Sequence, residues 1–123
     1  MTRTAALIEH AVLGWAICGG TIALGRLLLP IPTVLIVHAI VAPIAFALLS
    51  LHFFRGYAGI PPLRTSLVMV GIVIGLDGLV VAPFIEQSYA MFASPLGTWI
   101  PFASIWLASF LTGRACRQRR HAC

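Results

Sequence analysis

The chain has 123 residues, of which 60% are hydrophobic and only 9% are charged. A soluble domain is typically about one quarter charged, and a chain this small cannot bury so much apolar material in one core. A soluble globular protein is therefore excluded. The net charge of +5 comes from arginines that flank apolar runs, and this placement argues against a nucleic-acid partner.

Four apolar runs are long enough to cross a bilayer, which takes about 20 helical residues. They cover residues 5–29, 33–54, 65–85 and 96–112, and a basic tail of residues 113–123 follows. Backbone breakers separate the runs: Pro30, Pro32, Gly56, Pro61 and Pro62. The sequence predicts an all-α polytopic membrane protein, a four-transmembrane-helix bundle in a single domain of residues 1–123.

Arginine positions predict the orientation of these spans. With four crossings, the N-terminus, the connection between the second and third spans and the C-terminal tail lie on one side. The opposite side has only Arg26, with the acidic Glu86 near it. Because positive residues favour the cytoplasmic side, we expect both termini in the cytoplasm. The arginines on that side are Arg3, Arg55, Arg64, Arg114, Arg117, Arg119 and Arg120.

The first run, residues 5–29, carries ionisable residues near both ends. Glu9 and His10 lie near its inner end, and Arg26 lies near its outer end. Together with His52, Arg55 and Arg64 from the next two spans, Glu9 and His10 form an inner polar cluster. Long basic side chains at this level usually extend to the membrane surface, so we interpret this cluster mainly as interfacial.

The second run, residues 33–54, contains His38 and His52 on one helix face, about 21 Å apart in depth. A similar spacing occurs in membrane b-type cytochromes, in which each histidine ligates a haem. Each iron needs a second axial ligand, and His10 could serve together with His52. His38 has no evident partner, and Pro43 lies between the two histidines. A haem protein with ligands His10, His38 and His52, or a quinone redox protein, is therefore a lesser alternative, and we expect no bound cofactor.

The third run, residues 65–85, contains one carboxylate, Asp77, among valines, isoleucines and leucines. A charge inside the bilayer costs several kcal/mol unless it faces protein or water. Three states are open to Asp77: it is protonated and neutral, it pairs with Arg26 or His38, or it lines a hydrated cavity. A ridge of small residues on the same span suits close helix packing: Gly71, Gly75, Gly78 and Ala82.

The fourth run, residues 96–112, follows a segment rich in aromatic residues and turn formers that begins at Glu86. We expect this segment to cap the outer end of the bundle or to re-enter the membrane. In the basic tail, Cys116, His121 and Cys123 are irregularly spaced and too few for a metal site, and no metal is predicted.

Two stretches, "HAIVAPIAFALLS" from His38 to Ser50 and "LDGLVVAPFIEQSYAMFASPLGTWIPF" from Leu76 to Phe102, resemble a family of small, uncharacterised four-span bacterial membrane proteins. The resemblance covers about half of the chain. It implies the architecture and a place in a bacterial inner membrane as a multi-pass protein, and it brings no activity with it.

Counting about 1.5 Å per residue from the span ends places Asp77, His38 and Arg26 in the outer half of the bundle, with Glu86 at its mouth. Four helices enclose little more than their own side chains, so we expect a homo-oligomer, most simply a dimer, or a partner membrane subunit. Two functions stay open: a transporter or channel for a proton, cation or small solute that uses Asp77, and an accessory or assembly subunit of a larger complex. Nothing in the sequence indicates an enzyme.

Overall fold

The computed structural model is all-helical and describes residues 2–57, 59–85, 90–93 and 95–122. Four α-helices lie within these ranges: α1 (Arg3–Leu28), α2 (Ile31–Gly56), α3 (Pro62–Leu76) and α4 (Ile100–Ala122). A π-helical segment, Asp77–Ile85, continues directly from α3. A 3-10 turn at Ala90–Ala93 and a π-helical turn at Pro95–Trp99 precede α4.

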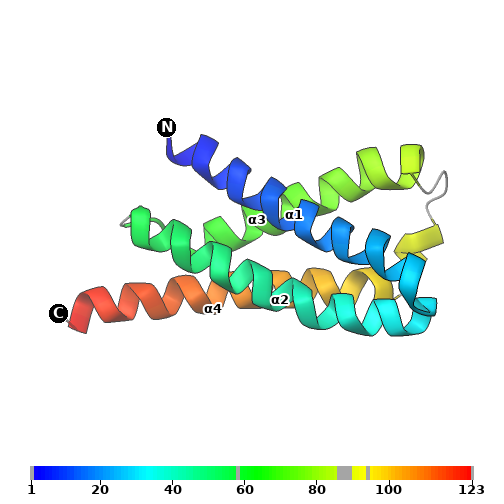
Figure 1. Ribbon diagram of the computed structural model, residues 1–123. Helices are drawn as coiled ribbons and strands as arrows, with labels where there is room; N and C mark the ends of the chain where they lie inside the picture. Colours follow the sequence, from blue (N-terminus) through cyan, green and yellow to red (C-terminus); the bar gives the residue numbers. More distant parts are fainter. Residues whose placement is uncertain (1, 58, 86–89, 94, 123) are drawn as a thin grey trace.

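The helices form an elongated bundle in which both chain ends lie at the same end (Figure 1). Around the bundle, α1 packs against α2, α2 against α4, α4 against α3, and α3 against α1. The connection from α2 to α3 lies at the end that holds the termini. The connection from α1 to α2 lies at the opposite end, together with the turns before α4.

The helix boundaries follow local chemistry. The Thr2 hydroxyl accepts a hydrogen bond from the Ala5 N–H at 3.1 Å and caps α1. Pro32 and Pro62 lie in the first turns of α2 and α3, where a missing N–H costs nothing because it would have no partner in the helix. Helix formation was predicted in each of these regions, and the all-α prediction is confirmed.

Regular α-helix ends at Asp77, although the apolar run continues to residue 85. Pro83 lies in this continuation; it has no N–H to donate, and its ring crowds the preceding turn. A π-helical stretch changes the direction in which the following side chains point, and such stretches are frequent at functional sites. The predicted third span is therefore one continuous segment with a change of helix type at its carboxylate.

Among the described residues, three segments are long and apolar enough to cross a membrane: Arg3–Leu28, Ile31–Gly56 and Pro62–Phe84. α4 is not one of these three segments, and Arg114, Arg117 and Arg119 occupy its last turns. The basic tail is thus the end of α4, and a fourth crossing remains a prediction. Large apolar side chains cover the outside of the bundle; Leu27, Leu28 and Leu79 are 80%, 81% and 73% exposed. The described surface is that of a membrane protein.

The core lies between the four helices, where eight buried residues form one cluster: Ala11, Cys18, Ala42, Phe46, Met69, Val73, Phe102 and Ile105. Glycines at the helix crossings allow the close approach. A Cβ added to Gly25 would lie 2.9 Å from Val34, and one added to Gly113 would lie 2.9 Å from Pro62. By contrast, a Cβ on Gly71 or Gly75 would meet nothing within 4 Å, so this part of the predicted small-residue ridge makes no close contact within the chain.

Candidate functional site

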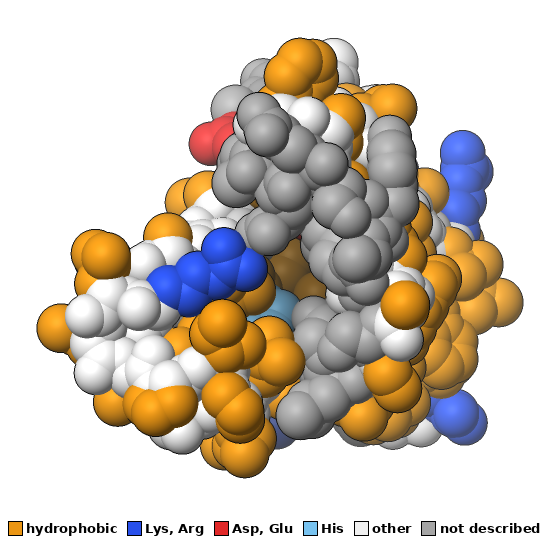
Figure 2. Space-filling view, turned by 90° about the vertical axis from the view of Figure 1, so that its right-hand side faces the viewer, with side chains coloured by type: hydrophobic (Ala, Val, Ile, Leu, Met, Phe, Trp, Pro, Cys, Tyr) orange, Lys and Arg blue, Asp and Glu red, His pale blue; other side chains and the backbone are white. Residues whose placement is uncertain are grey.

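A cavity of about 680 Å³ lies in the half of the bundle that contains the α1–α2 connection. Its walls come from α1, α2, the end of α3, the π-helical segment and the start of α4. Figure 2 looks onto this end of the molecule and shows a hollow among hydrophobic side chains, with histidine atoms inside it and an arginine beside it. The cavity is large enough to hold a small organic molecule.

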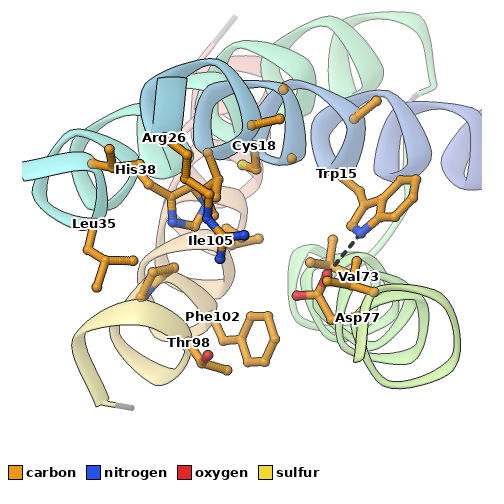
Figure 3. Close-up of a pocket in the computed structure, with 18 of the residues that line it drawn as sticks. Trp15, Cys18, Arg26, Leu35, His38, Val73, Asp77, Thr98, Phe102 and Ile105 are labelled. Atoms are coloured by element: carbon orange, nitrogen blue, oxygen red, sulfur yellow. Dashed lines mark hydrogen bonds between the residues drawn. The ribbon is translucent and has the colours of Figure 1, made fainter. Parts of the chain in front are cut away.

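Three of the four residues predicted for the outer site line this cavity: Arg26, His38 and Asp77. Arg26 and His38 lie on one side, and Asp77 lies on the other (Figure 3). Residues from three different helical segments are therefore brought to one space. Glu86, the fourth predicted residue, lies outside the described residues.

On the first side, Arg26 is an exposed residue in the last turn of α1, where the partial negative charge of the helix C-terminus favours a cation. His38 is only 6% exposed. Its Nδ1 atom is buried and has no hydrogen-bond partner in the part of the chain that the structure describes. A buried polar atom without a partner costs about 1–3 kcal/mol, so this side of the cavity has an unmet hydrogen-bonding capacity.

On the opposite side, the indole Nε1 of Trp15 donates a hydrogen bond of 2.9 Å to Oδ1 of Asp77. This bond joins α1 to the point where α3 becomes π-helical. Asp77 is half-buried, and the close-up shows its carboxyl group beside the cavity (Figure 3). Asp77 thus lines the cavity, and its hydrogen-bond donor is Trp15.

The rest of the lining is largely apolar. Phe102, Val73 and Ile105 contribute to it, together with the buried Thr98 and Cys18. The sequence analysis did not select Trp15, Cys18 or Thr98. The position of Trp15 could have been predicted, because Trp15, Ile22 and Arg26 follow the i, i+7, i+11 spacing of one helix face.

At the other end of the bundle, two residues of the predicted inner cluster meet. His10 Nε2 and His52 Nδ1 are 2.9 Å apart, with their rings stacked at 5.2 Å between centroids. The Nδ1 of His10 lies 2.7 Å from the Ala6 carbonyl oxygen, which can only accept a hydrogen bond, so this nitrogen carries a proton. Glu9, Arg55 and Arg64 are exposed, as expected for interfacial residues.

The histidine geometry bears on the haem alternative. His10 and His52 are in direct hydrogen-bond contact, so no iron fits between these two nitrogens as they stand. His38 lies at the other end of the bundle, in the cavity. No group of three or more His, Cys, Asp or Glu side chains with the geometry of a metal site occurs among the described residues; Cys123 and the side chain of His121 lie outside them. The pair His10 and His52 is therefore not arranged to ligate one iron in this structure.

Comparisons with protein-family models, with curated proteins and with solved structures give no match. The cavity and its residues therefore carry the functional argument.

Proposed function

We propose that the protein is a small four-span transporter or channel of the bacterial inner membrane, with both termini in the cytoplasm, and that it uses the cavity as a binding site for a proton, a cation or a small solute. The observation that carries the proposal is the position of Asp77, Arg26 and His38 around one cavity of about 680 Å³. Ionisable groups within a membrane-embedded bundle are costly and usually mark a substrate or ion pathway.

Asp77 is the residue to which we assign cation or proton binding. Its second oxygen has no hydrogen bond to a described residue, since Trp15 bonds only Oδ1. A carboxylate can hold a cation, and a protonated carboxyl group can release its proton into the cavity. Arg26 lies on the opposite side of the cavity, so the lining contains both an acidic and a basic side chain.

The residues that line the cavity lie in the half of the bundle that contains the α1–α2 connection. Phe46, Met69, Ser50 and Ser109 are fully buried between the cavity and the other end of the bundle. Passage through one copy would therefore require helices to move. We propose a homo-oligomer, most simply a dimer, in which the pathway continues along an interface or opens by relative helix motion. The exposed surface at Gly71 and Gly75 admits a close helix neighbour, as small residues do in membrane helix pairs.

The test is proton flux into proteoliposomes, followed with an enclosed pH-sensitive dye under an imposed potassium diffusion potential. Wild-type protein should give flux above that of empty liposomes, and Asp77→Asn should reduce it at least tenfold. Glu9→Gln is the matched control because it neutralises an exposed carboxylate on α1 outside the cavity lining. Flux that is equal in wild type and Asp77→Asn would refute Asp77 as the site.

One observation favours a second function, that of an accessory subunit. The Trp15–Asp77 hydrogen bond ties α1 to the third span, which is what a purely structural carboxylate does. On this hypothesis the apolar outer surface docks on another membrane protein. Stoichiometric co-purification of a second membrane protein would support it, and a homogeneous oligomer of this chain alone would count against it.

A further inference from the structure

A second hollow, of about 370 Å³, lies at the opposite end of the bundle from the cavity. It is formed where the start of α3 meets the last turns of α4, and we call it the basic notch. Its lining consists of Pro61, Pro62, Leu63, Phe110, Arg114, Arg117 and Gln118. None of these residues belongs to the site proposed above.

The notch depends on how closely the two segments approach. Gly113 is buried, and a Cβ at this position would lie 2.9 Å from Pro62 and 2.5 Å from Phe54. α4 therefore lies directly against the start of α3. Phe110, Arg114 and Arg117 follow at i, i+4 and i+7, the spacing of one helix face, so both guanidinium groups emerge on the side that faces the notch.

The charges in the notch are not neutralised within the described chain. The protein has three acidic residues: Asp77 lies at the distant cavity, Glu9 is on α1 and does not line the notch, and Glu86 is not described. Arg114 and Arg117 are exposed. Two guanidinium groups one helical turn apart offer several N–H donors, which suit the oxygens of a phosphate group.

The remainder of the notch is apolar. Leu63 is 49% exposed, and the ring of Phe110, which stacks on Trp106 at 5.6 Å between centroids, lies one turn before Arg114. A ligand with a phosphate next to hydrocarbon would contact both parts. We propose that the basic notch is a specific site for the headgroup of an anionic phospholipid, with the phosphate on Arg114 and Arg117, the start of the acyl chains on Leu63 and Phe110, and Gln118 beside the headgroup.

Such a site goes beyond the general attraction of a basic segment for an anionic membrane, because it assigns binding to two of the arginines and leaves the others out. Basic pockets between membrane helices bind anionic headgroups in this way. The lipid site does not depend on Asp77 or on transport, so it can be refuted without refuting the proposed function, and the reverse also holds.

The experiment measures lipid binding to purified full-length protein by native mass spectrometry in detergent, with phosphatidylglycerol and phosphatidylcholine as the two probes. Wild-type protein should bind phosphatidylglycerol at least tenfold more tightly than phosphatidylcholine. Arg114→Gln/Arg117→Gln should weaken that binding about thirtyfold, since each arginine near the surface contributes about 1 kcal/mol and a factor of ten corresponds to about 1.4 kcal/mol. The matched control, Arg3→Gln/Arg119→Gln, removes the same charge from exposed positions outside the notch and should bind as wild type does.

Two further arms separate the alternatives. Inorganic phosphate at millimolar concentration should not displace the lipid; displacement would identify free phosphate as the ligand and overturn the lipid assignment. Gln118→Glu keeps both arginines and places a negative charge beside the phosphate, so it should also weaken binding even if the double variant folds poorly. Equal binding of the two lipids, or equal loss in the two double variants, would refute a specific site.

Discussion

Trp15 and Asp77 are 62 positions apart in the chain, and their side chains share a hydrogen bond of 2.9 Å. The bond fixes the carboxyl group at the edge of the cavity and at the end of the regular part of α3. Asp77 therefore accepts a hydrogen bond that joins two helices, and we propose as its second, separable duty that it binds a proton or cation in the cavity that it lines.

Substitutions at the two positions should separate these duties. Asp77→Asn keeps an acceptor oxygen, so its free energy of unfolding should stay within about 0.5 kcal/mol of wild type, whereas Trp15→Phe and Asp77→Leu should each lose about 1 kcal/mol. Unfolding by sodium dodecyl sulfate in mixed micelles measures the difference. Glu9→Leu, at an exposed position, serves as the control. Wild-type stability in Trp15→Phe would show that the bond contributes nothing.

The close packing of α1 against α2 gives a second prediction. A Cβ at Gly14 would lie 2.8 Å from two ring carbons of Phe46, which is fully buried and cannot move aside. Gly14→Ala should therefore lower the free energy of unfolding by about 1–3 kcal/mol, the usual cost of overpacking a core.

Gly19→Ala, on the same helix, is the matched control for this substitution, because Gly19 is exposed and its added methyl group meets nothing within 4 Å. It should leave stability unchanged or raise it by less than about 1 kcal/mol through helix propensity. If the two variants lost stability equally, the contrast between a core glycine and a surface glycine would be wrong.

The positions of the glycines also show what the sequence can and cannot reveal. The spacing of Gly71 and Gly75 suggested close packing, yet the glycines in close contact within the chain are Gly14, Gly25 and Gly113. In a soluble helix the polar face identifies the outside, but here the outer face is as apolar as the core. A small-residue pattern therefore does not reveal which way its helix is turned.

Depth along the helices was accessible from sequence, whereas rotation about their axes was not. The predicted runs begin at residues 33 and 65, and the helices begin two to three residues earlier, at Ile31 and Pro62. A constant rise per residue placed Arg26, His38 and Asp77 in the outer half of the bundle, and all three line one cavity. The hydrogen-bond partner of Asp77 could not be predicted from depth alone. It depends on the change to π-helix at Asp77 and on the rotation of α1, both of which follow from tertiary packing.

The cavity itself gives a third prediction. Gly20 lines it, and a Cβ there would meet nothing within 4 Å, so Gly20→Leu should place its side chain in empty space without displacing the core. The proton flux of the proteoliposome assay should fall at least fivefold, while the free energy of unfolding stays within about 1 kcal/mol of wild type. Gly56→Leu, also in open space but outside the cavity lining, should retain wild-type flux. Full flux in Gly20→Leu would mean that the cavity is not the pathway.

The last prediction concerns the polar contact that closes the bundle below the cavity. The hydroxyl groups of Ser50 on α2 and Ser109 on α4 are 3.0 Å apart, and both also approach the sulfur of Met69 on α3. All three residues are fully buried. Ser50→Ala and Ser109→Ala should each destabilise the protein by about 1 kcal/mol, because each leaves the other hydroxyl with only a sulfur acceptor, which is weak.

The double variant Ser50→Ala/Ser109→Ala should cost less than the sum of the single variants, by about 0.5–1.5 kcal/mol, because it leaves neither hydroxyl unpaired. A second cycle that combines Ser50→Ala with Ser104→Ala is the control. The Ser104 hydroxyl donates to the Pro101 carbonyl oxygen within its own helix, so these two effects should add. Additive effects in the first cycle as well would show that Ser50 and Ser109 are not coupled, and the closure below the cavity would then rest on the packing of Phe46 and Met69 alone.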